Sequence, residues 1–170
     1  DSEGYTLGLD VKLMGELVPG ADSWISFSTM RSRMRFIDDK YNLGWIPMPR
    51  EQRYNLTMYF QDYVPRFPQY KLHLKFIWGE GMPFGYPHNE KMRYLGHMND
   101  YRRIDIGATR TFAANTDKWM KKSKYVESWS VQLDVFNLIG WKNENSYYWV
   151  TAADGLEWAS PNYLTGRMIN

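Results

Sequence analysis

The sequence predicts an all-β fold, namely a segment of an antiparallel transmembrane β-barrel with about six to seven meandering strands. Three observations predict it: apolar and polar residues alternate along most of the chain, aromatic residues are abundant, and the connections alternate between short and long. Hairpin Arg53–Gly79 shows the alternation most clearly, because the hydroxyl residues Thr57 and Tyr59 separate Leu56, Met58 and Phe60. Each strand therefore has one apolar and one polar face.

This alternation alone has two interpretations. An ordinary antiparallel sheet with one buried face shares it, so the alternative is a soluble β-sandwich that binds carbohydrate through exposed tryptophans. The connections run short, long, short, long, medium, long along the chain. Membrane barrels have short periplasmic turns and longer extracellular loops, so this order and the repetition of the pattern favour the barrel.

The composition limits the classes of function. Aromatic residues make up 17% of the 170 residues, which is high for a soluble domain, while the mean hydropathy is only -0.59. No run approaches the ~18 apolar residues of a spanning helix. A net charge of +2 argues against a nucleic-acid partner, and the absence of cysteine excludes disulfides and thiol chemistry. The N-terminus carries no signal peptide, so a mature chain or a fragment is expected.

The first hairpin is predicted from a strand at 5–18, a Pro-Gly turn at 19–22 and a strand at 23–36. The apolar residues of the second strand change phase near its middle, which predicts a β-bulge at 28–30. Beyond the bulge, three arginines share one face and are interpreted as a solvated polar face rather than an anion site: Arg31, Arg33 and Arg35.

The second hairpin, 53–79, turns at Pro65–Gln69, and the same alternation predicts three further strands, at 101–112, 128–137 and 163–170. The longer connections are expected at 37–52, 79–100, 113–127 and 138–161. The glycines after Gly79 fit no phosphate-binding loop, because no Lys-Ser or Lys-Thr pair follows and prolines prevent the helix. One connection is rich in lysine and is interpreted as a solvated turn rather than a site for anionic lipid or peptide: Lys118, Lys121, Lys122 and Lys124, with Trp119.

Four stretches, in order along the chain, match motifs of one known family. They are Gln52–Leu56 with Gly79–Phe84, similar to "DQRHNF … GSGLPF"; Tyr101–Gly107, similar to "YRRLDLG"; Val135–Leu138 with Lys142-Asn143, similar to "VFNLFN.KN"; and Tyr163–Asn170, similar to "YLTGRRIN". Together they resemble the C-terminal part of the barrel of TonB-dependent outer-membrane receptors of Gram-negative bacteria.

The resemblance implies that residues 1–170 are the C-terminal portion of an outer-membrane β-barrel, without the plug domain and the earlier strands. It implies active import of a scarce ligand through a plugged barrel, driven through TonB. Ligands in this family are iron-siderophore complexes, haem, cobalamin or glycans. The implied partners are the remaining barrel and plug, TonB, outer-membrane lipid and a surface lipoprotein that captures substrate, with no nucleic acid and no cofactor.

The residues expected to contact ligand are aromatic side chains in the predicted loops. They are Trp45, Tyr86, Trp141, Tyr147, Tyr148, Trp149 and Trp158. Aromatic faces on loops suit sugars, although anchoring at a membrane interface and packing between loops explain the same residues equally well.

No catalytic or metal site is predicted. Three carboxylates on predicted polar faces, Asp10, Asp105 and Asp134, are interpreted as members of a salt-bridge network with the cations of those faces rather than as acid–base catalysts. The three histidines, His73, His88 and His97, lack the spacing of metal ligands. No Gly-x-Ser-x-Gly nucleophile motif is present.

Overall fold

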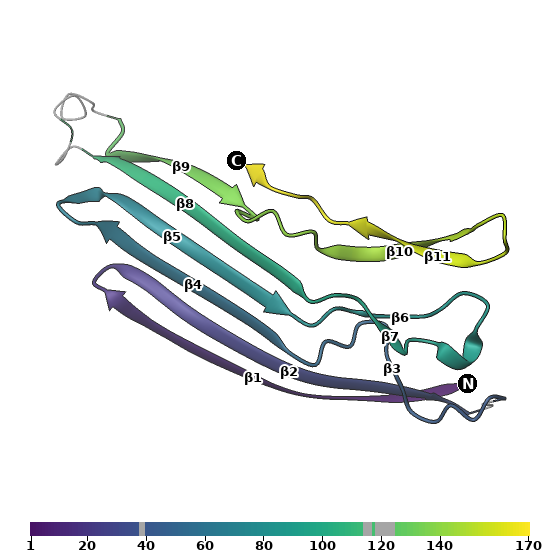
Figure 1. Cartoon of the computed structure of the whole chain (residues 1–170). Coiled ribbons are helices and arrows are strands. Elements are labelled where there is room, and N and C mark those ends of the chain that lie inside the picture. Colours follow the sequence, from purple (N-terminus) through teal and green to yellow (C-terminus); the bar gives the residue numbers. More distant parts are fainter. Residues whose placement is uncertain (38–39, 114–116, 118–124) are drawn as a thin grey trace.

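The computed structural model describes residues 1–37, 40–113, 117 and 125–170. The described chain is all-β, and its strands pair antiparallel in one large sheet and two small ones. The large sheet is open, because its order β1-β2-β4-β5-β8-β9-β12 brings no two ends together among the described residues (Figure 1). Within that part of the chain, no helix is long and apolar enough to cross a membrane.

The large sheet is a meander in which each long strand pairs with the next along the chain. Its strands are β1 (Ser2–Val18), β2 (Ala21–Phe36), β4 (Asn55–Val64), β5 (Phe67–Gly79), β8 (Tyr101–Ala113), β9 (Ser128–Phe136) and β12 (Met168–Ile169), with β3 (Ile46–Pro47) against β2. The first six strands predicted from the alternation are thereby confirmed. Gly20 and Arg66 have positive φ in two tight turns, as short hairpin connections require.

Of the predicted seventh strand, 163–170, only the end is confirmed. Tyr163 instead ends β11 (Glu157–Tyr163), which forms a hairpin with β10 (Glu144–Thr151), and only Met168–Ile169 pairs with β9. The connection predicted at 138–161 therefore contains most of a hairpin. Its strands escaped detection because aromatic residues stand on both faces of β10, so no two-residue contrast marks them.

The connection at 79–100 also has local structure: strand β6 (Pro83–Phe84), a 3-10 helix η1 (Glu90–Met92) and strand β7 (Gly96–His97). Strands β6 and β7 pair with each other in a second small sheet. The connection at 37–52 contributes β3 to the edge of β2. The predicted lysine-rich turn, with Lys118, Lys121, Lys122, Lys124 and Trp119, lies outside the described residues.

The predicted β-bulge at 28–30 is also wrong. Pairing of β1 with β2 is continuous from Ser2 opposite Phe36 to Glu16 opposite Asp22, and the register shifts only beside the turn, between Glu16 and Val18. The change of phase in the sequence has another cause. Beyond Ser28, β2 pairs with β3 instead of β4. The side of β2 that carries Ile25 and Phe27 before this point carries arginines after it.

The register places the large apolar residues of six strands on one side of the sheet, the apolar face. It is formed by Leu7, Leu9, Val11 and Leu13 of β1, Ile25 and Phe27 of β2, Leu56, Met58 and Phe60 of β4, Leu72, Leu74 and Phe76 of β5, Ile104 and Ile106 of β8, and Val131, Leu133 and Val135 of β9. Nothing in the described chain covers this face: Leu7 is 73% exposed, Leu74 42% and Leu133 56%. In the whole described chain, the buried hydrophobic residues are limited to Ala21 and Ile46.

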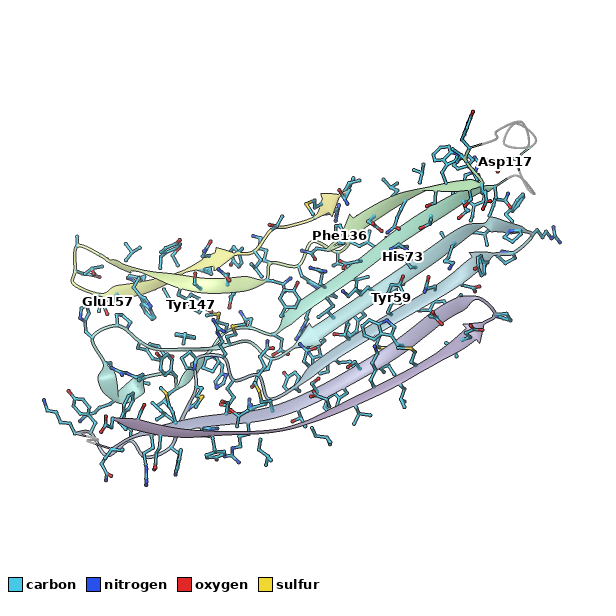
Figure 2. All side chains as sticks on the ribbon, turned by 180° about the vertical axis from the view of Figure 1, so that it is seen from behind. Tyr59, His73, Asp117, Phe136, Tyr147 and Glu157 are labelled. Atoms are coloured by element: carbon cyan, nitrogen blue, oxygen red, sulfur yellow. The ribbon has the colours of Figure 1, made fainter. Side chains whose placement is uncertain are left out.

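The opposite side, the polar face, carries a network of ion pairs and hydrogen bonds. His73 Nε2 lies 2.8 Å from Asp134 Oδ1 across β8, and Gln132 donates to the same carboxylate at 2.8 Å. On β8, the Arg103 guanidinium pairs with Asp105 at 2.8 Å. Figure 2 shows His73 beside Tyr59 on the neighbouring strand, and their rings are 5.9 Å apart. Of the three carboxylates considered in the sequence, Asp105 is therefore in a salt bridge and Asp134 is paired with a histidine.

A second set of contacts, the loop-base network, fixes the long connections to the strand ends. The buried Glu80 carboxylate accepts hydrogen bonds from Arg53 N at 2.7 Å and Arg53 Nε at 2.6 Å. Asp105 accepts from Asn137 N at 2.9 Å, and Asn143 exchanges two hydrogen bonds with the backbone of Arg102. Glu80, Asp105 and Asn143 are each satisfied by a partner from a different segment, which fixes the loop ends to the sheet.

Gly107 allows the His73–Asp134 pair to form, because a Cβ at this position would overlap both the imidazole and the carboxylate. Gly107→Ala is therefore expected to break the pair and destabilise the sheet by about 1–3 kcal/mol. Urea unfolding measures this change. The matched control is Gly15→Ala, where a Cβ meets no atom within 4 Å and a small gain is expected. A stable Gly107→Ala variant would contradict the assignment.

Acid should weaken the loop-base network. Burial alone would raise the pKa of Glu80, but its hydrogen bonds from Arg53 outweigh burial and lower that pKa below the ordinary 4.5. The stabilisation is therefore complete above the unfolded pKa and is lost as the pH falls through the lower, folded pKa. Urea midpoints between pH 7 and pH 3 should fall more steeply for the wild type than for Glu80→Gln. Parallel profiles would exclude a role for this carboxylate.

Candidate functional site

An aromatic cluster joins two loop segments that are far apart in the sequence. The Phe84 ring of β6 lies 5.2 Å from Tyr86 and 4.8 Å from Tyr147 of β10, and the rings of Tyr86 and Trp149 are 5.7 Å apart. The β10–β11 hairpin thus packs on the β6–β7 segment beyond the ends of β5 and β8 (Figure 1). Because residues 147 and 149 share one face of β10, both rings reach the same cluster.

A groove of about 670 Å³ opens beside this cluster. It is lined mainly by three aromatic rings and three polar side chains: Tyr86, Tyr94, Trp149, His88, Asn89 and Arg93. Five of these six come from the connection between β5 and β8, and Trp149 comes from β10. The combination of flat apolar surfaces and convergent hydrogen-bonding groups is typical of a ligand pocket.

Contacts from neighbouring elements hold the polar side of the groove. His88 Nε2 lies 3.4 Å from Glu157 Oε1 of β11, on the face of the hairpin that also carries Tyr147 and Trp149, and Figure 2 shows Glu157 at the far end of this hairpin. The Arg93 guanidinium stacks over the Phe36 ring at 5.3 Å. His88 and Tyr94 have φ of 54° and 57°, a left-handed conformation that is uncommon for such residues and is found at functional sites.

Glu144 connects the β10–β11 hairpin to the end of the loop that leads into β8. Its carboxylate accepts hydrogen bonds from Asn99 N at 3.0 Å, from Asn99 Nδ2 at 2.8 Å and from the Tyr147 hydroxyl at 2.7 Å. Burial acts to raise the pKa of Glu144, but these hydrogen bonds lower it below its ordinary value. Burial and the hydrogen bond to Glu144 raise the pKa of Tyr147 to about 12. At neutral pH, Glu144 is therefore an ionised acceptor and Tyr147 is a protonated donor.

The structure brings together some of the aromatic residues expected to contact ligand and separates others. Tyr86 and Trp149 line the groove, and Tyr147 supports it. Tyr148 and Trp158 lie on the opposite face of the hairpin, each 63% exposed.

The other two predicted residues lie elsewhere. Trp45 packs edge-on against Tyr5 at 5.0 Å with the Arg35 guanidinium over its ring, close to the apolar face. Trp141 lines a separate groove of about 460 Å³ with Asp100 and Arg102.

Sequence reasoning did not identify Tyr94, Asn89 and Arg93 as site residues. They lie in a stretch without periodicity, and only their place between two glycine- and proline-containing segments marks it as a structured loop. His88 was considered only as a metal ligand. Among the described residues, no group of three or more histidine, aspartate or glutamate side chains could hold a metal ion.

Comparison with known proteins adds no assignment: no protein-family model matches the chain, and neither a curated protein nor a solved structure matches it significantly.

Glu144→Ala should loosen the hairpin from the loop, because Asn99 and Tyr147 lose a shared, half-buried charged acceptor worth about 1–3 kcal/mol. Amide hydrogen exchange across residues 144–151 is expected to become about tenfold faster or more. The control, Asp154→Ala, removes an exposed carboxylate that accepts a hydrogen bond from Leu156 N near the hairpin tip. Equal exchange rates in both variants would show that Glu144 does not hold the hairpin.

Proposed function

We propose that the chain is the C-terminal segment of the barrel of a TonB-dependent outer-membrane receptor. The receptor imports a scarce ligand through a plugged barrel, and the groove at Tyr86 and Trp149 belongs to its extracellular loops. One observation carries the proposal: the apolar face covers six strands, and each of them carries exposed large apolar side chains on it. An apolar surface of this extent is unfavourable in water and matches the hydrocarbon layer of a bilayer.

The two ends of the apolar face carry aromatic and cationic side chains. Toward the loops, Trp45 packs against Tyr5 with Arg35 over it. Toward the short turns, Phe112 and Trp129 stack at 4.2 Å, and the Arg110 guanidinium lies 4.3 Å from the Phe112 ring. Aromatic rings with nearby cations at both limits of an apolar band are typical of the two interfaces of a membrane.

The sheet edges support a larger assembly. Strand β1 pairs only with β2 over its 17 residues, so its outer backbone groups have no strand partner in the described chain. Unsatisfied backbone groups in lipid cost several kcal/mol each, so the proposal requires further barrel strands at this edge. The polar face, with its His73–Asp134 and Arg103–Asp105 pairs, then lines the lumen and faces the plug through which TonB acts.

The soluble β-sandwich that binds carbohydrate is the second candidate, because an aromatic groove also suits such a protein. A sandwich requires the apolar faces of two sheets to pack on each other. The described chain has one large sheet, and its buried hydrophobic residues are limited to Ala21 and Ile46. The receptor proposal therefore accounts for the apolar face, and the sandwich does not.

Cell fractionation tests the proposal on the full protein that contains this chain. We expect the protein in the outer-membrane fraction, extracted by detergent and not by buffer or high salt. Recovery in buffer as a species near 20.2 kDa would refute the receptor and favour the sandwich.

A charge on the apolar face should prevent insertion. In the full protein, Leu74→Arg is expected to reduce the stability of the form folded into phosphatidylcholine vesicles by about 2–4 kcal/mol. Urea titration of the folded fraction measures this change. Ser130→Arg introduces the same side chain at an exposed position of the polar face and should change the midpoint little. Equal loss from both substitutions would contradict the assignment of the two faces.

A further inference from the structure

We infer that the groove between Tyr86, Tyr94 and Trp149 binds a neutral oligosaccharide. This inference names the class of ligand for the proposed receptor. It rests on the proposed function for the claim that the bound ligand is imported. The carrying observation is that two loop segments form one site with aromatic faces, hydrogen-bonding groups and little net charge.

The aromatic side of the groove suits sugar rings. The Tyr86 and Trp149 rings lie 5.7 Å apart at 55° to each other, so they form an angled platform rather than a closed stack. Tyr86 is 39% exposed, so part of its ring is open to a ligand. The C–H faces of a pyranose are apolar and pack on such rings, while its hydroxyls point outward.

The polar side of the groove supplies partners for those hydroxyls. Asn89 offers both donors and an acceptor, Arg93 offers several donors, and the His88 imidazole offers one or two. Arg93 is held over Phe36, and His88 is held beside Glu157, so part of the ordering cost is met before a ligand binds.

Charge separates a neutral sugar from an anionic iron complex. Arg93 is the permanent cation among the lining residues named, and the Glu157 carboxylate lies 3.4 Å from His88 at the rim. A strongly anionic ferric tricatecholate needs a cluster of cations, and the nearby carboxylate repels it. The groove therefore favours a ligand that is rich in hydroxyls and carries no charge.

The test uses the full protein, solubilised in detergent, with a mixture of neutral hexasaccharides built on glucose, mannose, galactose and xylose. Saturation-transfer NMR identifies any component that binds, and calorimetry measures its affinity. Trp149→Ala and Tyr86→Ala should each weaken binding about tenfold or more. Trp158→Ala is the matched control, because this ring lies on the opposite face of the hairpin and should leave affinity unchanged.

Two results would overturn the inference: no hexasaccharide binds to the folded wild type, or a ferric tricatecholate binds and depends on Trp149. Trp149→Phe, which keeps a ring, should retain part of the affinity and excludes misfolding as the cause of the loss. Fractionation distinguishes the two claims. A detergent-extracted receptor that binds no neutral sugar refutes this inference alone, whereas a buffer-soluble protein that binds sugar through Trp149 refutes the receptor alone.

Discussion

The antiparallel register is the constraint on which the whole structure depends. Side chains directly opposite each other share a face, and one row across the sheet contains Val11, Phe27, Leu56 and Trp78. A slip of one residue at any of these pairings would turn a whole strand over and place polar groups on the apolar face. The tight turns and the pairing of His73 with Asp134 across Gly107 both act to hold this register.

The loop-base network transmits this order from the sheet to the groove. Arg53 and Glu80 fix the ends of the β4–β5 hairpin, and the contacts of Asn137 and Asn143 fix the segment that leads into β10. The stretches that resemble receptor motifs contain these residues. Their side chains thus have a structural role in the described chain, because they position the loops rather than line the groove.

The sequence was sufficient to predict the strands whose two faces differ in polarity. The hairpin at 53–79 and the strands of β8 and β9 follow directly from that contrast. It was insufficient for β10, where Tyr147 and Tyr148 put similar aromatic rings on both faces. The groove could be predicted only in part, because Tyr86 and Trp149 are brought together by the packing of β10 on β6, which no local pattern specifies. The false β-bulge arose from a change of neighbouring strand, which is likewise a tertiary feature.

The central claim is that the apolar face lies against hydrocarbon, and spin-label accessibility tests it most directly. The chain contains no cysteine, so single cysteines can be introduced at Leu74 and Leu133 on the apolar face and at Thr57 and Gln132 on the polar face. In the reconstituted full protein, labels on the apolar face should collide with oxygen and be protected from a water-soluble nickel chelate, and labels on the polar face should show the reverse. Labels at Leu74 and Leu133 that neither reagent reaches would indicate a buried protein core and contradict the account.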